Sequence, residues 1–139
     1  MVVIDASGAV VGRLSARVAK LLLSKQEVEL INADKALMVG SLGAAKEKYS
    51  SRRRQQNKRT PEDSPVWPRA PHMLLRRIVR GMLPYKSQRG RDAYRRLKVV
   101  VGAPSGAAKP ARVPEANSEQ KHGTFTLSEL CKSLGGSGQ

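Results

Sequence analysis

Apolar residues along the chain form short continuous runs that alternate with stripes at helical spacing. The run 2–4 ends at the turn-forming sequence 5–8, which is typical of a buried strand that leads into a turn. One helical stripe follows, comprising Val11, Leu14, Val18, Leu21 and Leu22. The apolar runs 28–31 and 36–39 predict two more strands. Because strand, helix and strand fit within about 30 residues, we expect a βαβ unit whose first two strands are parallel.

The next part of the chain joins a helix to a long polar loop. Leu42, Ala45 and Tyr49 share one helical face, and this helix should run into the arginines at 52–54. Four prolines between residues 61 and 71 exclude a regular helix interior there. Loops of about 20 residues are usually functional or disordered. Since five cations lie between positions 52 and 59, we expect this loop to bind a partner and to order on it.

Two helices with separate apolar and basic sides should follow. Pro71 suits the first position of the earlier one, and Pro84 ends it. Its apolar side comprises Leu74, Leu75, Ile78, Val79 and Met82, and its opposite side comprises Arg76, Arg77 and Arg80. The shorter helix should turn Ala93, Tyr94 and Leu97 inward, and Arg91, Arg95 and Arg96 outward. A fourth strand is predicted at 99–101, closed by Gly102.

The C-terminal part combines a linker-like segment with a strong helix signal. Residues 103–123 contain three prolines and many small residues, which predicts an extended arm with little core. Thr126 and Glu129 then have the spacing of a capping box, and Phe125 and Leu130 that of its hydrophobic staple. The apolar stripe of the helix that follows comprises Leu127, Leu130, Cys131 and Leu134.

These elements predict a three-layer α/β/α fold around a mainly parallel four-stranded sheet. The 139 residues suit a single domain with appendages. We expect an α/β domain at 1–102 with a basic insertion at 46–98, an extended arm at 103–123, and a short C-terminal helix and tail at 124–139.

The charge of the chain is concentrated in its middle. The whole sequence has 26 Lys and Arg against 11 Asp and Glu, a formal net charge of +15. Residues 46–98 hold 17 of the bases and 4 of the acids, a net +13, which leaves +2 for the rest. Such asymmetry indicates a polyanionic partner, either nucleic acid or an acidic membrane surface. The aliphatic apolar side of the helix at 71–82 fits a sheet better than a membrane, and no apolar stretch approaches 18 residues.

Enzyme and metal chemistry find little support. The turn between Gly8 and Gly12 follows neither the P-loop nor the dinucleotide fingerprint. His72 and His122 lie 50 residues apart, which gives no basis for a histidine general base. The single cysteine excludes an intramolecular disulfide, and with two scattered histidines it makes no zinc site. We therefore expect no cofactor, no metal and no small-molecule substrate.

Three other residues are interpreted as structural. Asp5 and Asp34 could be a carboxylate pair at the ends of strands, but each suits a turn better. Cys131 lies on an apolar helical stripe and is expected to pack rather than to act as a nucleophile. An apolar, acidic N-terminus and a lone cysteine predict a soluble protein of a reducing compartment.

The residue types favour RNA among the polyanions. Arginine outnumbers lysine by 12 to 5 in the basic segment, and its planar fork suits phosphates and bases. Zinc-finger, basic-zipper and helix-turn-helix patterns are absent, as is an RNP-like aromatic cluster. The mode of binding that these exclusions leave is recognition of the shape and the phosphates of a folded RNA. The predicted RNA-binding residues are Arg13, Arg17, Lys48, Arg52, Arg53, Arg54, Lys58, Arg59, Arg69, Arg76, Arg77, Arg80, Gly81, Lys86, Arg89, Arg91, Arg95 and Arg96.

Five ordered motifs resemble the L-thirteen family of large-subunit ribosomal proteins, in its archaeal and eukaryotic branch. The resemblance covers roughly residues 1–104 and 124–135. The motifs are Ile4-Asp5-Ala6-x-Gly8 with Gly12-Arg13-Leu14, Arg69-Ala70-Pro71, Arg80-Gly81-Met82-Leu83-Pro84-x-Lys86, Arg89-Gly90, and Leu97-Lys98-Val99-x-x-Gly102-x-Pro104.

The resemblance implies a parallel four-stranded sheet with helices on both sides and a structural role without catalysis. It also implies large-subunit ribosomal RNA and neighbouring large-subunit proteins as partners, and a cytoplasmic location in the ribosome, with nucleolar assembly if the source is eukaryotic. Two alternatives stay open: a regulatory RNA-binding protein that acts off the ribosome, and a phosphate-binding enzyme.

Overall fold

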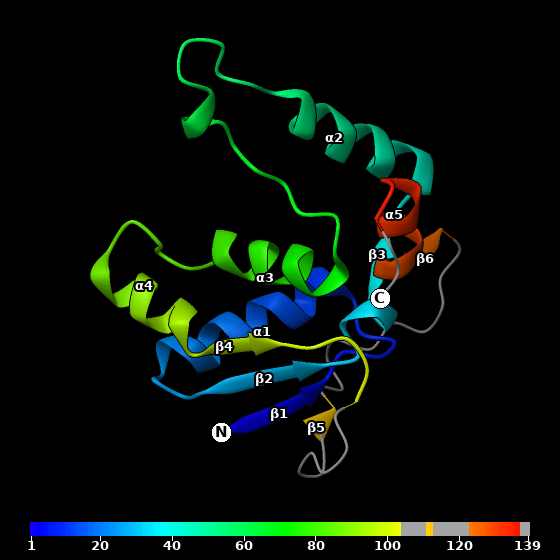
Figure 1. Cartoon of the computed structure of the whole chain (residues 1–139). Coiled ribbons are helices and arrows are strands. Elements are labelled where there is room, and N and C mark those ends of the chain that lie inside the picture. Colours follow the sequence, from blue (N-terminus) through cyan, green and yellow to red (C-terminus); the bar gives the residue numbers. More distant parts are fainter. Residues whose placement is uncertain (104–110, 113–122, 137–139) are drawn as a thin grey trace.

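The computed structural model describes residues 1–103, 111–112 and 123–136. Helices and strands alternate through the first half of the chain, and a short helix ends the described part (Figure 1). The elements are β1 (Val2–Asp5), α1 (Val11–Leu23), β2 (Val28–Ile31), the 3-10 helix η1 (Ala33–Lys35), β3 (Leu37–Val39), α2 (Leu42–Arg54), the 3-10 helix η2 (Pro61–Asp63), α3 (Pro71–Gly81), α4 (Gln88–Arg95), β4 (Leu97–Val99), β5 (Ala111–Arg112), β6 (Thr124–Thr126) and α5 (Leu127–Ser133).

The main sheet has the order β4-β2-β1-β5, and each neighbouring pair is parallel. The predicted parallel pairing of the first two strands is therefore confirmed, with Val2 opposite Val28. β4 begins two residues before the predicted strand at 99–101, because Leu97 pairs with Val28 directly after α4. Three of the four predicted strands thus form the parallel core of this sheet.

The fourth predicted strand, at 36–39, lies elsewhere. β3 pairs antiparallel with β6 in a separate two-stranded sheet, with Leu37 opposite Thr126. Only residues 32–36 separate β3 from β2, whereas a parallel neighbour needs a crossover of a dozen or more residues. The fourth strand of the main sheet is β5, a two-residue strand that lies within the segment 103–123 that we predicted to be an arm. The rest of that arm, apart from its end residues, lies outside the described residues.

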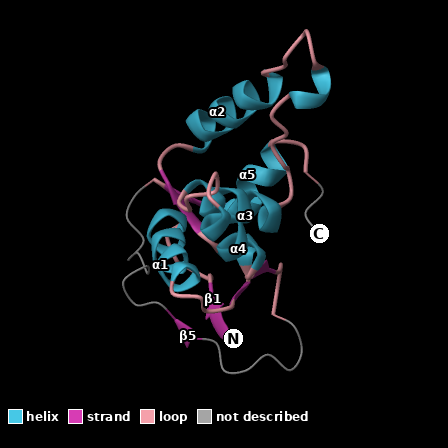
Figure 2. Cartoon of the chain, turned by 90° about the vertical axis from the view of Figure 1, so that its left-hand side faces the viewer, coloured by secondary structure: helices cyan, strands magenta, loops and turns pink. Residues whose placement is uncertain are grey.

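The described helices lie on one side of the main sheet, so the prediction of helices on both faces is confirmed for one face only. Figure 1 shows α1 behind the strands and α3 and α4 beside the β4 edge, and Figure 2 shows the same arrangement from the side. The order β1, β2, β4 advances in one direction across the sheet. Right-handed crossovers therefore place all the connecting helices on the same face.

The two faces of the sheet have different neighbours. Ile4, Leu30 and Leu97 lie on the helix side and join the buried core with α1 and α3. The predicted stripe of α1 is confirmed, except that Leu21 is only half-buried. On the opposite face Glu29 is buried and pairs with Lys98 of the neighbouring strand over 2.9 Å.

The C-terminal helix α5 has both of the end motifs that its sequence predicts. The Thr126 main-chain nitrogen donates to Glu129 Oε2 over 3.0 Å, and the Glu129 nitrogen donates to Thr126 Oγ1 over 3.2 Å, so the capping box is present as predicted. At the other end Gly135 has φ +77°, and the Gly136 nitrogen donates to the Cys131 carbonyl over 2.9 Å, which is a Schellman motif. The helix packs against α2, α3 and η1.

Candidate RNA interface

Helix α2 and the chain that follows it project from the body of the molecule (Figure 1). Tyr49 is the one buried residue of α2, and through it the helix joins the hydrophobic core, while its other residues are exposed or half-buried. After the loop the chain comes back to α2 at Trp67, whose ring lies edge-on to that of Tyr49 with 5.8 Å between the centroids. At the tip Asn57 Nδ2 donates to Thr60 Oγ1 over 2.7 Å. The projection therefore holds Arg54, Lys58 and Arg59 exposed to solvent, while the Tyr49–Trp67 pair and the packing of α2 against α5 anchor its base.

Two arginines from different elements stack on Trp67. The Arg77 guanidinium of α3 lies 4.0 Å from the ring centroid, and the Arg52 guanidinium of α2 lies 4.9 Å from it. Arg77 also donates from Nη1 to the main-chain oxygen of Val66 over 2.6 Å. Burial, together with the positive charges of Arg80 and Arg52, lowers the pKa of Arg77 below its ordinary value. Trp67 thus gathers cationic groups that repel each other.

The other two arginines of α3 lie on rings as well. The Arg76 guanidinium lies 4.8 Å from the ring centroid of Tyr94, and that of Arg80 lies 4.9 Å from that of Tyr85. These rings meet edge-on at 5.5 Å. The sequence correctly separated the arginines of α3 from most of its apolar side, although Met82 is exposed just past the end of the helix. All three arginines are half-buried rather than freely solvated. A stacked guanidinium still presents its in-plane N–H donors, so each arginine is oriented in advance for a phosphate.

Three further predicted RNA-binding arginines, in addition to Arg77, have main-chain acceptors within the protein. Arg96 donates to the Leu22 oxygen over 3.2 Å, Arg53 to the Leu134 oxygen over 3.3 Å, and Arg69 to the Gly135 oxygen over 3.4 Å. These oxygens lie at the C-terminal ends of α1 and α5. Cations there add a bond to carbonyls at the helix ends and oppose the negative end of the helix dipole, and the Leu22 oxygen also accepts from the Lys25 nitrogen.

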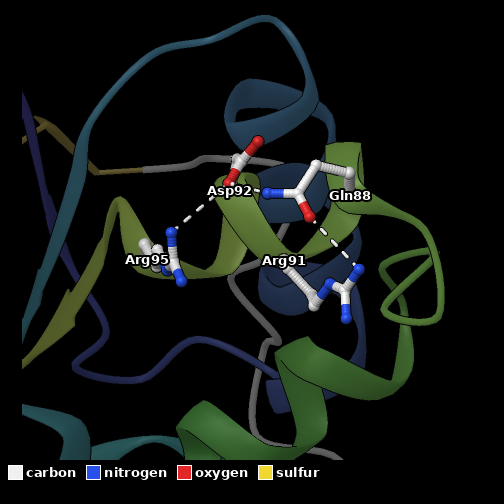
Figure 3. Close-up of polar contacts among 4 residues, drawn as sticks. All are labelled: Gln88, Arg91, Asp92 and Arg95. Carbon is white, nitrogen blue, oxygen red and sulfur yellow. Dashed lines mark hydrogen bonds and ion pairs between the residues drawn. The ribbon is translucent and has the colours of Figure 1, made fainter.

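Surface contacts connect the polar side chains of α4 (Figure 3). Asp92 pairs with Arg95 over 3.7 Å and accepts from Gln88 over 3.0 Å, and Arg91 donates to Gln88 over 3.1 Å. Solvent-exposed contacts of this kind contribute little to stability. Arg91 and Arg95 can therefore exchange them for a phosphate at small cost.

The remaining predicted cations are open to solvent. Their side chains make no hydrogen bond, ion pair or ring contact within the described part of the chain. They are Arg13, Arg17, Lys48, Arg54, Lys58, Arg59, Lys86 and Arg89. Arg13 and Arg17 lie on the solvent side of α1, and the others lie on α2, on its loop, on the approach to α4 and in the first turn of α4.

Sequence reasoning missed the rings that orient the arginines. The sequence pattern placed Tyr94 on the inward side of its helix and gave Trp67 and Tyr85 no role. A signal was present, since four of the five aromatic residues lie within the basic segment 46–98. Aromatic residues interleaved with arginines indicate stacked guanidinium groups.

The structural interpretation is confirmed for Asp5 and for the cysteine. Asp5 Oδ1 accepts from the Ser7 nitrogen over 3.0 Å and from Asn32 Nδ2 over 2.9 Å, which is the turn role predicted for it. Cys131 is buried, and burial raises the pKa of its thiol to about 11. In the part that the structure describes, no group of three potential ligand side chains could hold a metal, and no helix is long and apolar enough to cross a membrane.

The parallel sheet, its one-sided helices and the arginines collected on rings define a strongly basic α/β protein. A family model described as "Ribosomal protein L13" matches residues 1–106. The chain belongs to this family, as its motifs predicted.

Named relatives cover most of the chain. A "Large ribosomal subunit protein uL13" of Methanococcus maripaludis is 40% identical over 136 residues, 97% of this chain and 98% of the relative. The protein of the same name from Archaeoglobus fulgidus is 41% identical over 138 residues, covering 96% and 86%. The one from Methanococcoides burtonii is 51% identical over 104 residues, covering 75% and 73%.

Proposed function

We propose that the protein is a structural constituent of the large ribosomal subunit that binds and clamps folded ribosomal RNA through a basic face. Its partners are large-subunit ribosomal RNA and neighbouring large-subunit proteins, and it acts in the cytoplasm as part of the ribosome. It performs no chemistry of its own. The family and the printed names of the relatives support the ribosomal role.

The arrangement of the cations carries the RNA-binding part of the proposal. Eight predicted cations are exposed without side-chain partners in the described part of the chain, and the three arginines of α3 are pre-oriented on rings. Each phosphate that such a group neutralises releases condensed counterions, which favours binding without any base contact. Orienting the guanidinium groups beforehand reduces the side-chain entropy lost on binding.

Clamping follows from the positions of these cations on separate elements. Arg13 and Arg17 belong to α1, Arg54 and Lys58 to the projection, and Lys86 to the segment before α4. A folded RNA in contact with all three would be fixed in orientation as well as held. We assign the RNA-binding role to residues 1–102 and treat the chain at 103–123 and 124–139 as additions to this unit.

Ultraviolet crosslinking in cells, followed by RNA sequencing and mass spectrometry of the crosslinked peptides, tests this proposal. We expect reads enriched in large-subunit ribosomal RNA, and crosslinked peptides from α1, from the loop after α2 and from the segment around Lys86. Reads dominated by messenger RNA would instead support the regulatory alternative. Crosslinks confined to the opposite face of the sheet, around Lys98, would contradict the assigned face.

A further inference from the structure

A pocket of about 490 Å³ opens between the start of α1, β3, α2 and the end of α3. Its volume is within the range of small-ligand sites. The apolar part of its lining includes Val11, Leu37, Met38, Tyr49, Trp67 and Ile78. The basic-face proposal gives this pocket no role.

The charged groups of the pocket are all cationic. Arg52 and Arg77 are the charged residues among the described residues that line it, and both lie against Trp67. Arg13 and Arg80 directly follow and precede the lining residues Gly12 and Gly81. An apolar hollow with two arginines and no carboxylate in its described lining complements a ligand that joins a planar apolar group to an anion.

The protein leaves space in this pocket at two glycines. A Cβ atom added at Gly12 or at Gly81 would meet nothing within 4 Å, and neither glycine has a positive φ. Neither the backbone conformation nor packing within the protein therefore requires glycine at these two positions. They keep the pocket open at the ends of α1 and α3 that face it.

We propose that this pocket, which we call the Trp67 pocket, receives one unstacked base of the bound RNA while Arg52 and Arg77 contact the adjacent phosphate. The inference rests on the proposed function, since it assigns a binding mode to the same RNA. Proteins commonly recognise RNA through bases that leave the stack and lie against aromatic rings or guanidinium planes. An acidic peptide with an aromatic side chain would match the lining too. The two lining arginines favour RNA, because the phosphates on both sides of the base would neutralise them.

Trp67 supplies a specific probe, because it is the only tryptophan in the chain and lines the pocket. The full-length protein is titrated with two RNA hairpins that differ only in one bulged adenosine. We expect both hairpins to bind through the basic face. The bulged hairpin should bind about tenfold more tightly, a factor typical of one stacked base. It alone should change the Trp67 fluorescence.

A matched pair of variants separates the pocket from the general RNA surface. Gly12→Leu places a side chain in the open space of the pocket, and leucine forms helix better than glycine. Ala16→Leu adds the same side chain one turn further along α1, at an exposed position outside the lining. Gly12→Leu should lose the preference for the bulge and the fluorescence change while binding the paired hairpin as before. Ala16→Leu should keep both.

The outcomes distinguish this inference from the proposed function. Equal affinities and unchanged fluorescence with both hairpins would overturn the inference and leave RNA binding by the basic face intact. No binding of either hairpin would overturn both. A fluorescence response to an acidic, phenylalanine-containing peptide but not to the bulged hairpin would overturn the inference and assign the pocket to a protein partner. If Gly12→Leu does not fold, the comparison of hairpins on the unmodified protein still decides.

Discussion

The guanidinium of Arg96 donates a hydrogen bond to the main-chain oxygen of Leu22 over 3.2 Å. This hydrogen bond joins the residue before β4 to the last turn of α1, across 74 positions of sequence. Leu22 is fully buried and Arg96 is half-buried. An arginine that the sequence assigned to RNA thus completes the C-terminal end of the helix that covers the sheet.

We expect Arg96→Ala to destabilise the protein more than it weakens RNA binding. Loss of a charged hydrogen bond at a partly buried site costs about 1.5 kcal/mol of the free energy of unfolding. Arg95→Ala is the matched control, because Arg95 is exposed and pairs only with Asp92 at the described surface. It should leave the melting temperature nearly unchanged and reduce RNA affinity. Calorimetry and filter binding measure both effects, and a stable Arg96→Ala variant with weak RNA binding would contradict this role.

Simultaneous replacement of Arg76, Arg77 and Arg80 by alanine should affect both stability and binding. A freely solvated basic side would predict little loss of folding, but each side chain stacks on a ring. Removal of the three cation–π interactions should lower the free energy of unfolding by about 2 kcal/mol. The slope of log K against log salt should fall by about 0.7 to 0.9 for each phosphate that the variant no longer neutralises.

The triple lysine variant at the same positions separates the two effects. Lysine keeps the three charges but has no planar group to stack or to bind phosphate through two donors. The salt slope should therefore stay close to that of the unmodified protein, whereas thermal unfolding should show reduced stability. If the folded fraction of the alanine variant binds RNA with the original affinity and slope, α3 does not face the RNA.

Gly81→Ala should weaken RNA binding without destabilising the protein. A glycine near the end of this helix has two explanations: a positive φ or close backbone packing within the protein, or an RNA backbone that approaches it. Gly81 has no positive φ, and a Cβ there would meet nothing within 4 Å, so the explanation that remains of the two is the approach of an RNA backbone. Alanine favours helix over glycine by up to about 1 kcal/mol. Thermal unfolding should therefore show equal or greater stability, and unchanged RNA affinity would contradict the explanation.

Gly90 provides the opposite control, because there the missing side chain is a packing requirement. A Cβ at Gly90 would overlap the Pro84 carbonyl and would lie 2.9 Å from the Tyr85 nitrogen. Both obstacles are backbone, so neither moves aside easily. Gly90→Ala should lower the free energy of unfolding by about 3 kcal/mol, at the upper end for overpacked cores. Equal melting temperatures for the Gly81 and Gly90 variants would show that the two glycines do not differ in this way.

The Cys131 thiol should be unreactive in the folded protein and should make stability fall at high pH. Because burial raises its pKa from 9.0 to about 11, its thiolate fraction near neutral pH is about a hundredth of that of an ordinary cysteine. Between these two pKa values the unfolded chain loses this proton and the folded chain keeps it, so stability decreases as pH rises from about 9 to 11. Thiol labelling at pH 8 should require unfolding, and Cys131→Ala should flatten the alkaline part of the stability curve. Rapid labelling of the native protein would contradict this burial.

Local signals in the sequence predicted most helices and the first strands. The strands that were placed wrongly or missed are those whose partners lie far away in the sequence. The capping box of α5 and the apolar stripe of α1 depend on neighbours a few residues away, and both appear in the structure. The partner of β3 lies about 87 positions further along the chain, in β6, where no short-range pattern points to it. β5 is only two residues long and pairs with β1, so neither length nor periodicity could indicate it.

The candidate site was predictable as a segment but not as a set of individual roles. Charge counting finds the basic residues between 46 and 98 without any structure. Whether an arginine is open like Arg54, stacked like Arg77 or bonded to a helix end like Arg96 depends on rings and carbonyls brought close by the fold. The Trp67 pocket has the same origin, since it joins lining residues from four separate elements.

Sedimentation of cell lysate through a sucrose gradient tests the central claim most directly, with the full-length protein followed by immunoblotting. A structural constituent of the large subunit should appear in the large-subunit, whole-ribosome and polysome fractions and be nearly absent from the top of the gradient. Separation of the subunits at low magnesium should move it entirely into the large-subunit peak. Recovery at the top of the gradient, or in RNA particles lighter than the large subunit, would contradict the account.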